Sequence, residues 1–119
     1  MSETDQTLSS KDGLTLFTRE WTVEYPKAVI AFIHGFGEHS GRYAHLAGFF
    51  NKSGYSVYSF YNRGHGKSKG KRGHAPNYEH YLDDIDVFLD FVKAQTDAKP
   101  IFLYGHSMGG NLVLNYVLR

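Results

Sequence analysis

The sequence predicts an α/β domain: a β-hairpin followed by a mostly parallel sheet with helices on both faces. Three observations predict it, namely a tight-turn signal near the N-terminus, three short apolar runs, and segments with helical spacing that alternate with those runs. Alternation of strands and helices in this order is typical of a parallel sheet covered by helices. Ligand sites in such sheets lie at the carboxyl ends of the strands, so candidate functional residues are sought there.

The hairpin is predicted by Lys-Asp-Gly at 11–13, between extended segments at 8–10 and 14–21. Asp-Gly favours a tight turn because glycine accepts a positive φ without a Cβ clash. Residues 1–6 are polar and acidic, and we expect them to form a disordered tail. They lack the basic start and the apolar run of a secretory signal.

Apolar runs without alternation indicate strands that are buried on both faces, as in a parallel sheet. Such runs are at 28–33 and 101–104, and a second β-rich run is at 57–61. Nothing in the chain follows that would cover the outer edge of the strand at 101–104, so we expect that edge to be exposed. Apolar residues at helical spacing predict three helices, the first of them stopped by Gly54. These helices are at 43–50, 78–92 and 108–119. The aspartates of the second helix are predicted to form a solvated face, at Asp83, Asp84, Asp86 and Asp90.

Composition narrows the class of protein. The chain has 119 residues, 41% of them hydrophobic and 21% charged, with a formal net charge of +1, which is typical of a globular domain. There is no cysteine, which excludes disulfides, thiolate metal sites and a cysteine nucleophile. No apolar stretch approaches membrane-spanning length. These features predict a cytoplasmic protein that binds no nucleic acid.

The clearest chemical motif is GHSMG, a G-x-S-x-G pattern centred on Ser107 between a predicted strand and a predicted helix. A sharp strand-to-helix turn holds such a serine in a strained conformation and lifts its Oγ clear of the sheet, as a nucleophile requires. Gly105 and Gly109 flank it because side chains there would collide across the turn, and Gly110 lets the helix approach the strand. The Met108 N–H, at the positive end of the helix, is the first predicted oxyanion donor.

A second motif, HGFG at 34–37, follows the first parallel strand. In a serine hydrolase with this layout, the loop after that strand supplies the second oxyanion donor, here the Phe36 N–H. Gly35 and Gly37 leave the backbone free to turn that N–H towards the nucleophile. We interpret the His34 side chain as structural.

Three segments together resemble the monoacylglycerol lipase and lysophospholipase group of α/β-hydrolases, often described as serine aminopeptidase S33-like or hydrolase 4. They are HGFGEHSGRY (34–43), RGHGKSKGKRGH (63–74) and GHSMGG (105–110). The resemblance extends from about residue 8 to the last residue. It implies the α/β-hydrolase fold and a small acyl ester substrate, such as a monoglyceride or a lysophospholipid.

By the same resemblance, Ser107 is the nucleophile, and Phe36 and Met108 offer the oxyanion amides. One position departs from the family, which usually has Asp-x-Arg-Gly after the fourth strand. Here Tyr61 stands in place of that aspartate. Tyrosine cannot supply the negative charge that would pair with or orient the Arg-Gly loop, although this position is not part of a catalytic triad.

A serine nucleophile needs a histidine base and an acid that orients it, and in this fold both follow the serine along the chain. All seven histidines precede or abut Ser107, and no His, Asp or Glu follows it. We therefore expect residues 1–119 to be the N-terminal part of a single α/β-hydrolase domain, truncated after the nucleophile helix and inactive alone. No cluster with metal-ligand spacing appears, so we expect neither a metal nor a cofactor.

Alternative functions rest on weaker signals. Gly-Lys-Ser at 66–68 resembles the end of a nucleotide-binding P-loop, but the first glycine of that motif would fall on Tyr61 and no helix signal follows. An inactive half-domain or scaffold with a basic lipid-binding loop is a further alternative. That loop would make transient contacts with a membrane surface. Its basic residues are Arg63, Lys67, Lys69, Lys71 and Arg72.

Overall fold

The structure is a computed structural model of the chain. It describes residues 2–33, 44–61, 78–96, 99–105 and 116–118. The elements are β1 (Ser2–Ser9), β2 (Thr15–Thr22), β3 (Ala28–Ile33), α1 (Ala44–Lys52), β4 (Tyr55–Phe60), α2 (Tyr78–Gln95) and β5 (Ile101–Gly105). Residues 116–118 are helical.

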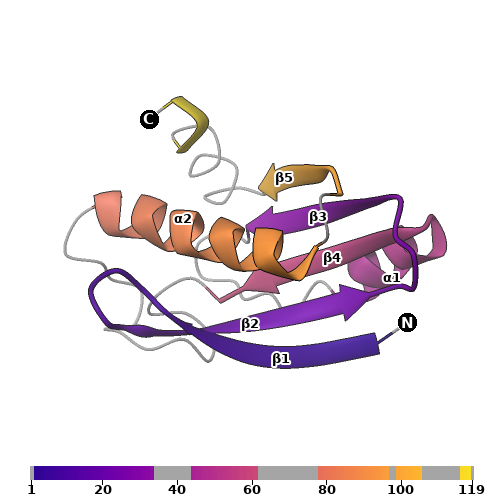
Figure 1. The fold of residues 1–119 in the computed structure, drawn as a ribbon, viewed down its shortest axis with the longest axis horizontal. Helices are drawn as coiled ribbons and strands as arrows, with labels where there is room; N and C mark the ends of the chain where they lie inside the picture. Colours follow the sequence, from indigo (N-terminus) through magenta and orange to yellow (C-terminus); the bar gives the residue numbers. More distant parts are fainter. Residues whose placement is uncertain (1, 34–43, 62–77, 97–98, 106–115, 119) are drawn as a thin grey trace.

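The five strands form one sheet in the order β1-β2-β4-β3-β5 (Figure 1). The β1–β2 and β2–β4 pairs are antiparallel, whereas β3 runs parallel to both of its neighbours, β4 and β5. The predicted hairpin followed by parallel strands is thereby confirmed. The turn between β1 and β2 contains Gly13 at φ 84°, a value that favours glycine.

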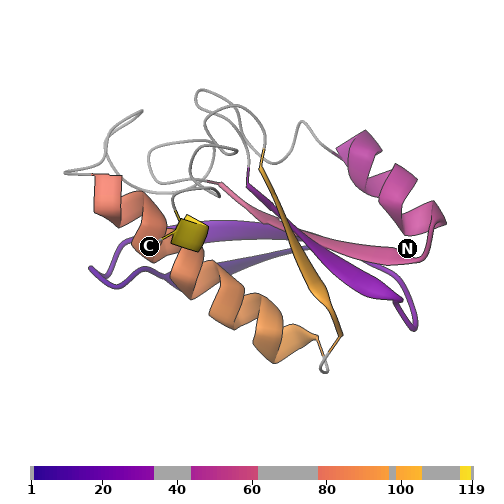
Figure 2. The same cartoon turned by 90° about the horizontal axis from the view of Figure 1, so that it is seen from above.

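The sheet carries α2 on one face and α1 on the other (Figure 2). On the α2 side the rings of Phe60 and Phe88 pack with their centroids 4.7 Å apart. On the α1 side Trp21 is the largest buried side chain. All six residues of β3 are buried, as its unbroken apolar run predicts for a central strand. Burial of both sheet faces supplies most of the stabilisation of such a domain.

The N-terminus differs from the prediction, because residues 2–6 belong to β1 and do not form a disordered tail. The ladder between β1 and β2 begins at the pair Ser2 and Thr22. Side chains reinforce it: Arg19 donates to both carboxylate oxygens of Asp5, at 2.7 and 2.9 Å. Because this pairing is specified by β2, the composition of the tail alone could not reveal it.

Two further expectations are corrected. Asp84 is 1% exposed and so is not part of a solvated face. The run at 101–104 is the edge strand β5, in agreement with its expected uncovered outer edge, but it is not buried as predicted, because Phe102 is 58% and Tyr104 is 44% exposed. These two rings share the α1 side of the sheet with Ile30, but α1 contacts β4 and β2, which leaves β5 uncovered by that helix.

A buried tyrosine in β4 is expected to make the free energy of unfolding fall as the pH rises in the alkaline range. Tyr58 is 5% exposed and lies opposite Glu20 of β2. Burial, and then the Glu20 charge, raise the pKa of Tyr58 from 10.0 to about 12. The unfolded chain therefore loses this proton at a lower pH than the folded chain. We expect about 2–3 kcal/mol of the free energy of unfolding, fully present below pH 10, to be lost as the pH rises to 12.

Urea unfolding across this pH range measures the loss. Tyr58→Phe should flatten the pH dependence between pH 10 and 12, because phenylalanine has no proton to lose. Tyr25→Phe is the matched control, since Tyr25 is 87% exposed. An equal slope in Tyr58→Phe and in the control would contradict the assignment.

Candidate active site

The parallel strands of the sheet end at the same level. Ile33, the last residue of β3, is paired with Phe60 of β4 and with Gly105 of β5. Neighbouring strands lie about 4.8 Å apart. The strand ends after which residues 34 and 106 follow are therefore adjacent, at the end of the sheet towards which β3, β4 and β5 point (Figure 1).

Packing fixes these exit points. Ile33 and Phe60 are fully buried. The rings of Phe32 and Tyr104 stack with their centroids 5.0 Å apart, which joins the ends of β3 and β5. Beyond β4, Tyr61 is 3% exposed and its N–H donates to the Phe17 carbonyl at 2.9 Å. The position at which the sequence departs from the family it resembles is thus occupied by a buried tyrosine.

Of the predicted site residues, only Gly105 lies within the described part of the chain, as the last residue of β5. The other predicted residues lie outside the described ranges, so their roles remain predictions. They are Gly35, Phe36, Gly37, Ser107, Met108, Gly109 and Gly110. The basic loop residues Arg63, Lys67, Lys69, Lys71 and Arg72 also lie outside these ranges.

The pairing of the two strand ends nevertheless limits the distance between the starts of the HGFG and GHSMG motifs. Phe36 lies three residues beyond Ile33, and Ser107 lies two residues beyond Gly105. An extended chain advances at most about 3.6 Å per residue, so each residue is within about 11 Å of its strand end. Because those ends are paired neighbours, the structure brings together the attachment points of the nucleophile motif and the oxyanion loop.

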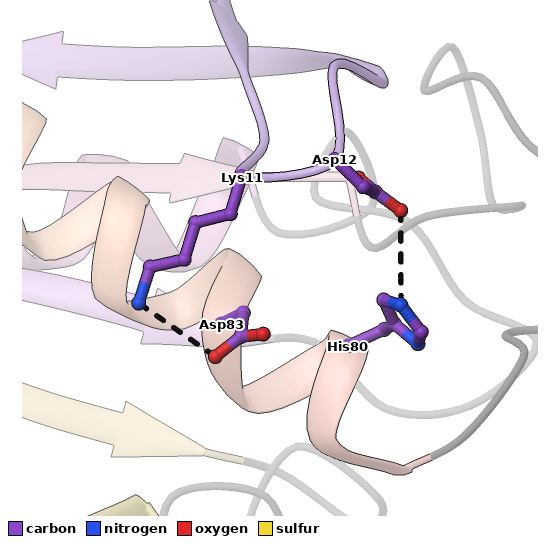
Figure 3. Close-up of a pocket in the computed structure, with 4 residues that line it drawn as sticks. All are labelled: Lys11, Asp12, His80 and Asp83. Carbon is purple, nitrogen blue, oxygen red and sulfur yellow. Dashed lines mark ion pairs between the residues drawn. The ribbon is translucent and has the colours of Figure 1, made fainter.

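A charged pocket that sequence reasoning missed lies at the same end of the sheet, between the β1–β2 turn and the start of α2 (Figure 3). It encloses about 150 Å³ and is lined by Lys11, Asp12, His80 and Asp83. The Nζ of Lys11 lies 3.7 Å from Oδ1 of Asp83, and Nε2 of His80 lies 3.9 Å from Oδ2 of Asp12. Asp83 follows His80 by three residues, which places both on one helix face.

An ion pair and a hydrogen bond next to this pocket connect separate elements of the fold. Lys11 also pairs with Asp86 of α2, at 2.7 Å from Nζ to Oδ2, and the Tyr116 hydroxyl donates to Oδ1 of Asp86 at 2.9 Å. The hairpin turn, α2 and the helical segment 116–118 are therefore joined through one carboxylate. In the strand order, β4 and β3 lie between β2 and β5. The His80–Asp12 pair, next to the β1–β2 turn, is therefore separated by most of the width of the sheet from the end of β5, after which the chain continues to Ser107. Within the described ranges, no group of three or more His, Asp or Glu side chains could hold a metal ion.

Comparison with known protein families finds a match over residues 24–119, to the family described as hydrolase 4, serine aminopeptidase S33. The matched region begins before β3 and includes both motifs. Within the part of the chain that the structure describes, no helix has the length and apolarity needed to cross a membrane.

Two curated relatives and one solved structure illustrate the similarity. An uncharacterised abhydrolase domain-containing protein of Dictyostelium discoideum is 45% identical over 100% of the chain and 12% of its own length. Human monoglyceride lipase is 37% identical over 90% of the chain and 36% of its own length. The structure of a soluble variant of monoglyceride lipase from Saccharomyces cerevisiae superposes with a TM-score of 0.83 at 28% identity, covering 98% of this chain and 39% of that one. The chain thus spans less than half the length of these relatives.

Proposed function

The chain belongs to the hydrolase 4, serine aminopeptidase S33 family and has the N-terminal part of the α/β-hydrolase fold, and on that premise we propose that it carries the nucleophile of a serine ester hydrolase, Ser107. The observation that supports the proposal most strongly is the pairing of Ile33 with Gly105. It gives the oxyanion loop and the nucleophile motif neighbouring starting points at the carboxyl edge of the sheet, where α/β folds bind their ligands.

The proposed reaction proceeds through an acyl-enzyme. The Ser107 Oγ attacks the ester carbonyl carbon while a base takes its proton, and the carbonyl oxygen becomes an oxyanion. The N–H groups of Phe36 and Met108 donate hydrogen bonds to that oxyanion. The C–O bond to the alcohol then breaks and the alcohol leaves with the proton. Water hydrolyses the acyl-serine by the same steps, which restores the free hydroxyl.

The base for this reaction is proposed to come from outside residues 1–119. His80 is engaged with Asp12 across the hairpin turn, at 3.9 Å. His45 lies exposed on α1, which packs mainly on β4 and β2. The other histidines lie outside the described ranges and precede or abut Ser107. We propose that a longer polypeptide, comparable in length to the relatives, supplies the histidine and its acid partner.

The proposed substrates are monoacylglycerols or lysophospholipids. Relatives named monoglyceride lipase and phospholipase YtpA are 37% and 40% identical to the chain. The family description names an aminopeptidase, which makes peptide-bond hydrolysis the second candidate. The basic segment at 63–72 would assist a lipid substrate by transient contact with an anionic membrane surface.

Hydrolysis by the longer polypeptide of three substrates distinguishes these candidates: a monoacylglycerol, a lysophosphatidylcholine and an aminoacyl anilide. We expect the highest kcat/KM for the monoacylglycerol and little turnover of the anilide, because an amine is a poorer leaving group than an alcohol. The Ser107→Ala variant gives the background for each substrate. Faster turnover of the anilide than of both lipids would favour the aminopeptidase. Absence of Ser107-dependent turnover of all three would favour a scaffold.

A further inference from the structure

The segment that carries Ser107 is attached at both ends to described parts of the fold. At its start, Gly105 ends β5 and is paired with the central strand β3. Nine residues after Ser107, Tyr116 lies in the helical segment 116–118 and packs against the buried cluster between the sheet and α2. The position of Ser107 is therefore constrained from two sides, by what holds Gly105 and by what holds Tyr116.

Tyr116 connects this helical segment to α2. It is partly buried, whereas the next two residues, Val117 and Leu118, are 68% and 75% exposed. Its hydroxyl donates to Oδ1 of Asp86 at 2.9 Å. Apolar packing of the ring is non-directional, whereas a hydrogen bond to a carboxylate is directional and about twice as strong as one between neutral groups. The bond to Asp86 therefore fixes where along α2 the tyrosine lies.

The Asp86 carboxylate is held from its other side by the hairpin turn. Its Oδ2 lies 2.7 Å from Nζ of Lys11, which also lies 3.7 Å from Oδ1 of Asp83. Lys11 belongs to a turn that is closed by backbone hydrogen bonds of 2.8 and 3.0 Å. Because the side chains of Lys11 and Asp86 are 49% and 40% exposed, their ion pair adds little stability by itself. Its consequence is geometric, since it directs one carboxylate oxygen to the hairpin turn and leaves the other for Tyr116.

We propose that Asp86 is a positioning residue for the nucleophile, because through Tyr116 it fixes the far end of the segment that carries Ser107. The inference rests on the proposed function of Ser107. In the helix that the sequence predicts over 108–119, a rise of 1.5 Å per residue places Tyr116 about 14 Å from Ser107. A helix is stiff over this length, so restraint of its last turn sets the direction of its first turn. That first turn carries the Met108 N–H, and the alignment of this donor with the oxyanion determines how well it stabilises the transition state.

Three variants of the longer polypeptide test this role. Tyr116→Phe keeps the ring and removes the donor, Asp86→Ala removes both contacts of the carboxylate, and Asp86→Asn keeps an oxygen that can accept from Tyr116. Asp90→Ala is the matched control, because Asp90 is an exposed aspartate one turn further along α2. The measurements are steady-state kinetics with a monoacylglycerol and the rate of Ser107 modification by a fluorophosphonate. Both are made well below the Tm of each variant, where a loss of stability alone does not lower kcat.

We expect Tyr116→Phe and Asp86→Ala each to lower kcat roughly tenfold with KM nearly unchanged, and to slow Ser107 modification by a similar factor. The double variant should lose no more than Asp86→Ala alone, because both changes remove the same hydrogen bond. Asp86→Asn should lose less than Asp86→Ala, and Asp90→Ala should match the unmodified protein. Unchanged kcat and modification rate in Tyr116→Phe and Asp86→Ala would overturn the role of Asp86 and leave Ser107 as the nucleophile. Absence of Ser107 modification and of turnover in the unmodified polypeptide would instead refute the proposed function, and with it this role.

Discussion

The Ser107→Ala variant of the longer polypeptide is expected to lose about 10⁵–10⁶-fold in kcat for a monoacylglycerol. Alanine has no atom that can form the acyl-enzyme, so only the binding and oxyanion contributions remain. In the related arrangement of a serine with its histidine, removal of the serine costs nearly as much as removal of the whole triad. Steady-state kinetics with a chromogenic short-chain ester and with the monoacylglycerol measure this loss.

The same kinetics need a control that changes a serine away from the site. Ser53→Ala serves this purpose, because Ser53 is exposed in the turn after α1 and precedes β4, at the opposite end of that strand. We expect its kcat and KM to match those of the unmodified protein. A Ser107→Ala variant that retained more than about one per cent of the turnover would contradict the nucleophile assignment.

The isolated 119-residue chain is expected to hydrolyse the same esters at least about 10⁴-fold more slowly than the longer polypeptide. The serine needs a base to remove its proton, and none of the seven histidines follows it in the chain. A serine without its base contributes little more than an alanine. Ser107→Ala should therefore change the residual turnover of the isolated chain only slightly.

Comparison of the isolated chain with its Ser107→Ala variant distinguishes two explanations of low turnover, a missing base and a wrongly assigned nucleophile. Robust hydrolysis by the isolated chain that Ser107→Ala abolishes would place the base within residues 1–119. His80→Gln would then be the first variant to measure, because His80 lies beside a carboxylate, Asp12. Circular dichroism of each variant shows whether a loss of turnover comes from loss of the fold.

The order of the elements from β2 to β5 could be predicted because each of these elements has a signal in its own sequence. The apolar run that became β3, the helical spacing that became α2 and the Asp-Gly turn at Gly13 each depend on neighbours in sequence. Gly54 ended α1 as predicted and adopts φ 91°. The start of β4 at Tyr55, two residues before its predicted start, is the usual uncertainty of element boundaries.

The remaining differences arise from long-range contacts. The strand at 2–9 exists because β2 pairs with it, although its own sequence is polar. Asp84 is buried despite its charge, and Phe102 and Tyr104 are exposed despite their rings, because tertiary position decides both. Local periodicity does not specify which elements cover a given face.

The candidate sites also divide into one that local sequence motifs indicate and one that only long-range contacts bring together. Ser107 and the HGFG loop belong to contiguous motifs, so the sequence could nominate them, and the register of Ile33 with Gly105 brings their exits together. The charged pocket draws Lys11 and Asp12 from the hairpin turn, and His80 and Asp83 from the start of α2. No motif connects such residues, so only the folded arrangement reveals them.

Covalent labelling tests the nucleophile assignment most directly. The longer polypeptide would be treated with a fluorophosphonate, digested with trypsin and mapped by mass spectrometry. We predict a single adduct on the peptide 94–119, in which Ser107 is the only serine. An adduct on a different peptide, or ester hydrolysis that persists with no adduct at Ser107, would contradict Ser107 as the nucleophile.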